Sequence, residues 1–229
     1  MDAVNEIIDK LKEKARPEQL AGMKRFGMAT EQRLGVRIPD LRKMAKEIGK
    51  NHELALELWQ TPIDEARILA GMIAEPQKLT GRQMENWVKD FNSWDVCDQV
   101  CMNLFDKTPL PLFEKIHDWS QRHEEYVKRA GFALIASLAR HDKKMADEKF
   151  VALFSLIKNG AADERNFVKK AVNWALRNIG KRNPQLNRLA LEVAYEMRQS
   201  DSKSARWIAA DAVRELESDA VQRRLKNRQ

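Results

Sequence analysis

The sequence predicts an all-α fold, a right-handed α-solenoid of stacked helical hairpins that forms a single domain from residue 1 to residue 229. Apolar residues recur at the i, i+3, i+4 and i+7 spacing of an amphipathic helix along almost the whole chain. No segment shows the strict alternation that is typical of a half-buried strand. The breaks between short helical segments coincide with prolines, which interrupt helices: Pro17, Pro39, Pro62, Pro76, Pro109, Pro111 and Pro184.

An internal repeat supports the solenoid. The stretch VKRAGFALIASLA from Val127 is similar to VKKAVNWALRNIG, which begins 41 residues later at Val168. A looser copy, SARWIAADAVREL, begins at Ser204. A period of roughly 40 residues with one Ala-rich helix per unit is typical of HEAT-like repeats, whose equivalent helices form an extended concave surface. We therefore expect a partner to bind on that surface.

The composition is that of a folded protein without a cofactor. Of the 229 residues, 43% are hydrophobic and 33% charged. No apolar run approaches the roughly 18 residues of a membrane-spanning helix, and the start of the chain lacks the apolar block of a signal peptide, so we expect a cytoplasmic protein. Cys97 and Cys101 lie one helical turn apart, which suits packing better than a disulfide or zinc. The histidine and glycine spacings predict neither a metal site nor a nucleotide cofactor, and we expect a monomer.

Positive charge is concentrated in the C-terminal part of the chain. From Arg165 onward there are 15 Lys and Arg against 7 Asp and Glu, whereas the preceding residues have 26 against 27. Such asymmetry favours a surface that binds a polyanion. Charge alone leaves open the alternative of a solvated helical surface.

A helix is expected from Asn92 or Ser93, either of which can act as the N-cap. Asp95 then lies in the first turn, where the helix dipole favours an anion. Asp98 lies beyond that turn, at the rim of the apolar stripe and on the same side as Trp94, so it is either paired with a basic neighbour or available to a ligand. The apolar stripe itself comprises Val96, Cys97, Val100, Cys101 and Leu104.

The helix expected from residue 125 to 139 is apolar nearly all round, as a central buried helix should be. Its second turn nevertheless carries Lys128 and Arg129. Arg129 lies on the side of two small residues, Ala133 and Ala136, which leave room for a phosphate or for a carboxylate partner within the protein. Both readings stay open.

The helix expected from residue 168 to 179 has one apolar stripe, made of Val168, Ala171, Val172, Ala175, Leu176 and Ile179. Trp174 falls outside this stripe and is flanked by Lys170 and Arg177. An aromatic ring between two cations is suited to contact with a sugar or base between phosphates. The alternative is that Trp174 packs against an adjacent repeat.

These segments together resemble the HEAT-like repeat DNA glycosylases, the AlkD-type family of alkylpurine repair enzymes. The similarity covers most of the chain. The motifs agree with those of the family in residue type, in order and in spacing. It is carried by SWDVCD at 93–98, similar to the family's Trp-Asp-x-x-Asp signature, by VKRA at 127–130, by VKKAVNWALR at 168–177 ahead of KRNP, and by LGVRIPDLRK at 34–43.

The resemblance implies a hydrolase that cleaves the N-glycosidic bond of cationic alkylated purines in double-stranded DNA, without extruding the base into a pocket. It implies that Asp98 is the catalytic carboxylate, that Trp94 and Trp174 flank the deoxyribose of the lesion, and that Arg129 holds a backbone phosphate. On this reading the concave surface is the DNA-binding face. The further cations expected to contact the DNA backbone are Lys128, Lys170, Arg177 and Arg206.

One position departs from the family pattern. Where the resemblance implies an aromatic residue just before Met23 and Lys24, this chain has Gly22. Relatives of this fold that lack the aspartate bind DNA without excision, so the presence of Asp98 favours an enzyme. Two alternatives remain: a non-catalytic protein that binds damaged or branched DNA, and a HEAT-type scaffold for protein interactions.

Overall fold

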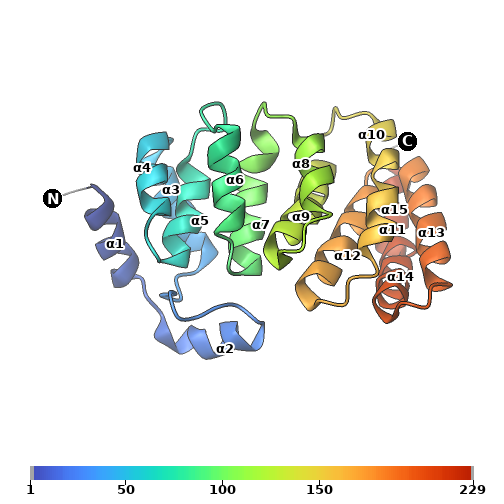
Figure 1. Cartoon of the computed structure of the whole chain (residues 1–229), viewed down its shortest axis with the longest axis horizontal. Coiled ribbons are helices and arrows are strands. Elements are labelled where there is room, and N and C mark those ends of the chain that lie inside the picture. Colours follow the sequence, from blue (N-terminus) through green and yellow to red (C-terminus); the bar gives the residue numbers. More distant parts are fainter. Residues whose placement is uncertain (1–2, 228–229) are drawn as a thin grey trace. The chain divides into compact units, whose positions relative to one another are not determined.

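The computed structural model describes residues 3–227, in which every regular element is helical (Figure 1). The all-α prediction is therefore confirmed. The chain divides into two compact units, Met1–Leu110 and Pro111–Gln229, which we describe separately. The expectation of a single domain stays a prediction.

The first unit contains seven α-helices and two short 3₁₀ helices within the described residues: α1 (Ala3–Glu13), η1 (Pro17–Gln19), α2 (Leu20–Arg25), α3 (Ile38–Ile48), α4 (His52–Trp59), α5 (Asp64–Ile73), α6 (Gly81–Lys89), α7 (Trp94–Asn103) and η2 (Phe105–Lys107). Helix α5 is central, since it packs against α3, α4 and α7. Its Gly71 allows a close approach to α7, because a Cβ atom there would lie 3.1 Å from the Val100 side chain. Trp59 of α4 stacks on Trp87 of α6, with ring centroids 4.0 Å apart.

The second unit is built from the remaining helices: α8 (Leu112–Trp119), α9 (Glu125–His141), α10 (Asp147–Ala152), α11 (Phe154–Gly160), α12 (Asn166–Gly180), α13 (Pro184–Arg198), α14 (Lys203–Leu216) and α15 (Asp219–Lys226). Helices α8 and α9 form one hairpin and α13 and α14 another, and α12 packs against α9, α11, α13 and α14. Figure 1 shows α9 and α12 side by side in this unit.

The repeat copies found in the sequence occupy equivalent places in the second unit. They lie in α9, α12 and α14, and each of the first two packs against the next. The predicted apolar stripe of α12 is buried throughout: Val168, Ala171, Val172, Ala175, Leu176 and Ile179. The prediction that these copies form helices that pack one after another is therefore confirmed.

The prolines lie at helix boundaries, as predicted. Pro39 and Pro184 occupy the first turn of α3 and α13, where the missing amide proton leaves no helical hydrogen bond unmade. Pro62 separates α4 from α5, and Pro76 separates α5 from α6. None of the helices within residues 3–227 combines the length and apolar character needed to cross a membrane.

Candidate functional site

Helix α7 carries the two residues that the sequence singled out first. Trp94 is the first residue of the helix and Asp98 lies one turn later, so both side chains leave the same face. Asp98 is only 9% exposed, whereas Trp94 is half-buried. The predicted core stripe is confirmed, because all of its members are buried: Val96, Cys97, Val100, Cys101 and Leu104. The first unit thus positions a carboxylate and an indole together on a firmly packed helix.

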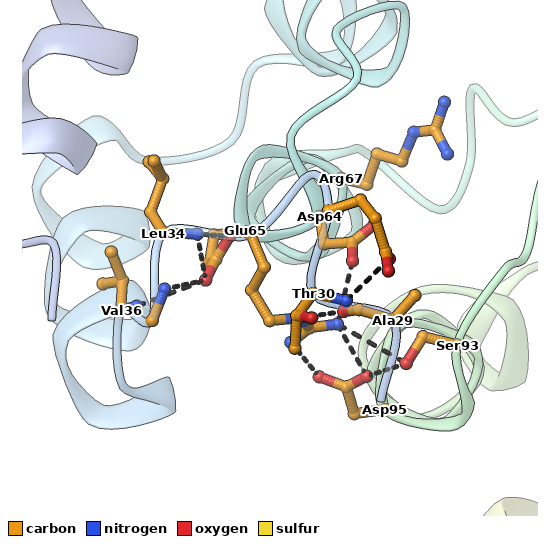
Figure 2. Close-up of polar contacts among 12 residues, drawn as sticks. Ala29, Thr30, Leu34, Val36, Asp64, Glu65, Arg67, Ser93 and Asp95 are labelled. Carbon is orange, nitrogen blue, oxygen red and sulfur yellow. Dashed lines mark hydrogen bonds and ion pairs between the residues drawn. The ribbon is translucent and has the colours of Figure 1, made fainter. Parts of the chain in front are cut away.

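The start of α7 is held by a buried arginine, Arg33, which binds the labelled Asp95 (Figure 2). Arg33, whose side chain is 2% exposed, donates to both carboxylate oxygens of Asp95 at 2.6 and 2.9 Å and to Asp64 at 3.0 Å. Ser93 precedes the helix as predicted, but its hydroxyl donates to Asp95 at 2.6 Å and does not cap the helix. The helix dipole therefore explains Asp95 only in part. Its main partner comes from a segment 62 residues earlier in the chain.

Burial and charge compete in this cluster. Burial disfavours the charged form of Arg33, but the carboxylates of Asp95 and Asp64 outweigh it and raise the pKa of the guanidinium. Burial raises the pKa of Asp64, although Arg33 opposes that shift. The arginine is thus a fixed charge that both carboxylates require.

A second buried carboxylate fixes the same segment. Glu65 accepts hydrogen bonds from the backbone amides of Leu34, Gly35 and Val36, the shortest being 2.7 Å from Gly35 (Figure 2). Gly35 has φ +81°, and a Cβ atom there would lie 2.3 Å from the carbonyl oxygen of Arg16. Only glycine fits this turn. The segment between α2 and α3 is therefore clamped to the N-terminal ends of α5 and α7.

The indole of Trp94 is oriented by the same part of the chain. Its Nε1 atom donates to the carbonyl oxygen of Phe26 at 3.1 Å. Phe26 follows directly after α2, and its side chain is 73% exposed. Gly22, which departs from the family pattern, lies in α2. The hydrogen bond to Phe26 places the end of this helix beside Trp94. The sequence did not single out Phe26. The signal that could have identified Phe26 is an aromatic residue that belongs to no apolar stripe.

In the second unit, the two neighbouring cations near the start of α9 have partners within the protein. Arg129 is 5% exposed, and its Nη1 atom donates to the carbonyl oxygen of Phe167 at 2.5 Å. Lys128 lies 3.1 Å from the carboxylate of Asp163. Asp163 also binds Arg165, at 2.6 Å. Arg129 thus binds a backbone carbonyl within the protein, and its expected contact with a DNA phosphate stays a prediction.

The hydrogen bond from Arg165, aided by Lys128, lowers the pKa of Asp163 to about 2 against the opposing effect of burial. A depressed pKa means that the stabilisation is complete above about pH 4 and is lost as the pH falls from about 4 to about 2. We expect Asp163→Asn to reduce the free energy of unfolding at pH 7 by at most about 2 kcal/mol, because solvent screens such pairs.

Urea unfolding between pH 2 and pH 7 measures this effect of Asp163. The difference between wild type and Asp163→Asn should shrink across that acid range, and Asp118→Asn, at an exposed surface pair, serves as the control. A difference that stays constant down to pH 2 would show that the ion pairs of Asp163 do not stabilise the fold.

Helix α12 presents Trp174 outside its buried stripe, as predicted, with the indole half-buried. Lys170 is exposed on the same helix. Arg177 pairs with Glu215 of α14 and lies 3.7 Å from Asp211. These contacts leave Lys170 as the most exposed cation beside Trp174.

The third repeat copy contributes the last of the expected cations. Arg206 is exposed, and it donates to the carbonyl oxygens of Ser200 at 2.8 Å and Asp201 at 2.9 Å. These carbonyls lie in the turn between α13 and α14, so Arg206 holds that turn in place. Its expected contact with DNA stays a prediction.

A basic hollow of about 520 Å³ lies at the C-terminal ends of α9 and α12. Its basic lining residues are Arg140, His141, Lys143, Lys181 and Arg224, the last from α15. Asn178 also lines it and donates to the carbonyl oxygen of Trp174 at 2.9 Å, so the hollow begins one helical turn from Trp174. The sequence indicated positive charge in this region without locating the hollow.

The family model described as DNA alkylation repair enzyme matches residues 7–216. The chain belongs to the DNA alkylation repair enzyme family. This DNA alkylation repair family member is also 25% identical to the uncharacterized protein Lin0241 of Listeria innocua serovar 6a over 164 residues, 70% of each chain.

A solved structure also matches, with a TM-score of 0.76 and 21% sequence identity over 94% of this chain and 95% of that one. It is described as a new family of proteins related to the HEAT-like repeat DNA glycosylases with affinity for branched DNA structures. The likeness shows that this DNA alkylation repair family member has the fold of the HEAT-like repeat glycosylases, as the sequence predicted.

The two cysteines of this family member are buried beside Asp98 in α7, and neither forms a disulfide. Burial raises the pKa of the Cys101 thiol well above its ordinary value, and Cys97 and the charge of Asp98 act in the same direction. A thiol that stays protonated is a poor nucleophile and a poor metal ligand. Within the described part of the chain, no group of three His, Cys, Asp or Glu side chains is placed to hold a metal ion.

Proposed function

We propose that this protein is a DNA glycosylase that hydrolyses the N-glycosidic bond of cationic alkylated purines, of the 3-methyladenine and 7-methylguanine type, in duplex DNA. The bond from the purine nitrogen to C1′ breaks, and its electron pair leaves with the base. Water then adds to C1′ of the oxocarbenium-like sugar, losing a proton. A cationic purine is already a good leaving group, so the reaction needs no general acid.

The observation that carries this proposal is Asp98 beside Trp94 on α7, in a chain of the DNA alkylation repair family. A carboxylate with 9% exposure acts in a weakly polar environment, where its attraction for developing positive charge is strong. Asp98 stabilises the sugar cation and orients the attacking water, while the face of Trp94 favours the same charge. The network around Arg33 holds the start of this helix in place.

The second unit supplies DNA-binding groups in this proposal. We assign Trp174 to the deoxyribose of the lesion, and Arg129, Lys128, Lys170, Arg177 and Arg206 to the backbone. The partner contacts of Arg129 and Lys128 fix their side chains. The basic hollow, one turn from Trp174, adds positive potential that attracts the DNA backbone.

Release of free base tests the proposal. A duplex treated with a methylating agent is incubated with the protein, and free 7-methylguanine and 3-methyladenine are measured by chromatography against incubation without protein. We expect release well above the spontaneous rate. Release no faster than that without protein would contradict the proposed activity.

A second candidate function is binding of branched DNA without excision. The observation that favours it is the solved structure of similar fold, described as related to these glycosylases with affinity for branched DNA structures. This candidate predicts salt-sensitive binding to a four-way junction and no release of base from any alkylated duplex. The base-release measurement therefore separates the two.

A further inference from the structure

Trp207 of α14 is the tryptophan that packing explains least. It is 42% exposed, whereas Trp59 and Trp119 are fully buried. The ammonium of Lys169, from α12, lies 4.9 Å from the centroid of its ring. The indole therefore exposes a large apolar surface next to the ammonium group of Lys169.

This indole lines a hollow of about 330 Å³, together with Glu164, Lys169, Lys203 and Ser204. We call it the Trp207 hollow. The hydroxyl of Ser204 donates to the carbonyl oxygen of Asp163 at 2.8 Å, so it is committed to the protein. What the hollow offers a ligand is one aromatic face, two ammonium groups and one carboxylate.

That set of groups matches a nucleotide. A flat ring can stack on the indole, the two ammonium groups can bind a phosphate, and the carboxylate can accept a hydrogen bond from a base amino group. An apolar peptide side chain fits less well, because Trp207 is the only large apolar residue in the lining. Within a duplex both faces of an internal base are covered by its neighbours, so the base must be unpaired.

We propose that the Trp207 hollow binds one unpaired nucleotide of a DNA strand, with its base stacked on Trp207 and its phosphate on Lys169 and Lys203. This inference rests on the proposed function in so far as the chain binds DNA. Lys169 is adjacent in α12 to Lys170, which we assign to the DNA backbone. A strand that contacts Lys170 therefore lies one residue from Lys169 in the lining of the hollow.

The test compares two undamaged DNAs, a blunt duplex and the same duplex with a single-stranded overhang, by fluorescence anisotropy. Wild type should bind the overhang DNA on the order of tenfold more tightly, the usual effect of one stacked base. Trp207→Ala should lose this preference and Trp207→Phe should keep most of it. Tyr195→Ala, which removes another exposed aromatic residue, from α13, is the matched control and should behave as wild type.

Equal wild-type affinity for the two DNAs, or an unchanged preference in Trp207→Ala, would overturn the inference. A free deoxynucleoside monophosphate that displaces the DNA, when wild type shows no preference for the overhang, would also overturn the inference. The hollow would then bind a small nucleotide and not a DNA strand. Release of 7-methylguanine from a blunt duplex by Trp207→Ala is measured in parallel. If wild type releases 7-methylguanine but shows no preference for the overhang, only the inference about the Trp207 hollow is rejected. If wild type releases no 7-methylguanine, the glycosylase proposal is rejected.

Discussion

Asp98→Asn is expected to slow release of 7-methylguanine from a methylated duplex by at least about 100-fold while leaving binding to undamaged duplex little changed. Asparagine keeps the shape of the side chain but lacks the negative charge that stabilises the oxocarbenium-like sugar. Loss of one such preorganised electrostatic group raises the barrier by about 3 kcal/mol. Single-turnover base release and duplex binding, measured on the same preparation, give the two quantities.

The control for Asp98→Asn is the same substitution at Asp118, an exposed carboxylate of α8 that pairs with Arg122. It removes an equal charge and should leave both release and binding at the wild-type level. Melting curves of both variants establish that they are folded. Release by Asp98→Asn at the wild-type rate would remove this residue from the mechanism, even if the protein proved to be a glycosylase.

The helices and their buried faces could be read from the sequence because burial follows a local period. Val168 and Ile179 are fully buried and Trp174 lies outside their stripe, as 3.6-residue geometry requires. The repeat was visible for the same reason, since equivalent helices face the same neighbours. Burial of each residue here depends mainly on its position within its own helix.

The anchoring of the candidate site could not be read from the sequence, because it depends on contacts between distant segments. Arg33 is 62 residues from Asp95 and 31 from Asp64, and neither spacing is periodic. The place of Asp95 in the first turn of its helix accounts for a carboxylate there without any partner, so the local sequence does not point to Arg33. The carbonyl of Phe167, which binds Arg129, is a backbone group and leaves no trace in the sequence.

Gly22 gives a second example of a contact that depends on the path of the chain and not on one residue position. The resemblance implies an aromatic ring at one position in the chain, where this sequence has Gly22. In the structure the exposed Phe26 follows directly after α2, and its carbonyl oxygen accepts a hydrogen bond from the indole of Trp94. Proximity to the site therefore comes from the path of the chain after α2, which one residue position does not specify.

Arg33→Ala is expected to lower the free energy of unfolding by about 3–5 kcal/mol, because it leaves the buried carboxylate of Asp64 and the largely buried one of Asp95 without their cation. The side chains of Arg33 and Asp64 are 2% and 0% exposed, so water cannot replace the lost contacts without opening the structure. Arg37→Ala is the matched control: this arginine is 56% exposed and pairs with Asp40, and its loss should reduce stability by less than about 1 kcal/mol. Urea unfolding at pH 7 measures both.

Neutralising the carboxylates tests whether charge is the cause. Asp64→Asn and Asp95→Asn, added to Arg33→Ala, should recover part of the lost stability, because an uncharged buried amide is less unfavourable than an unpaired buried carboxylate. No recovery would attribute the loss to the packing of the Arg33 side chain. If Arg33→Ala were no more destabilising than Arg37→Ala, the cluster would not hold the start of α7, and Trp94 would have to be fixed by its bond to Phe26.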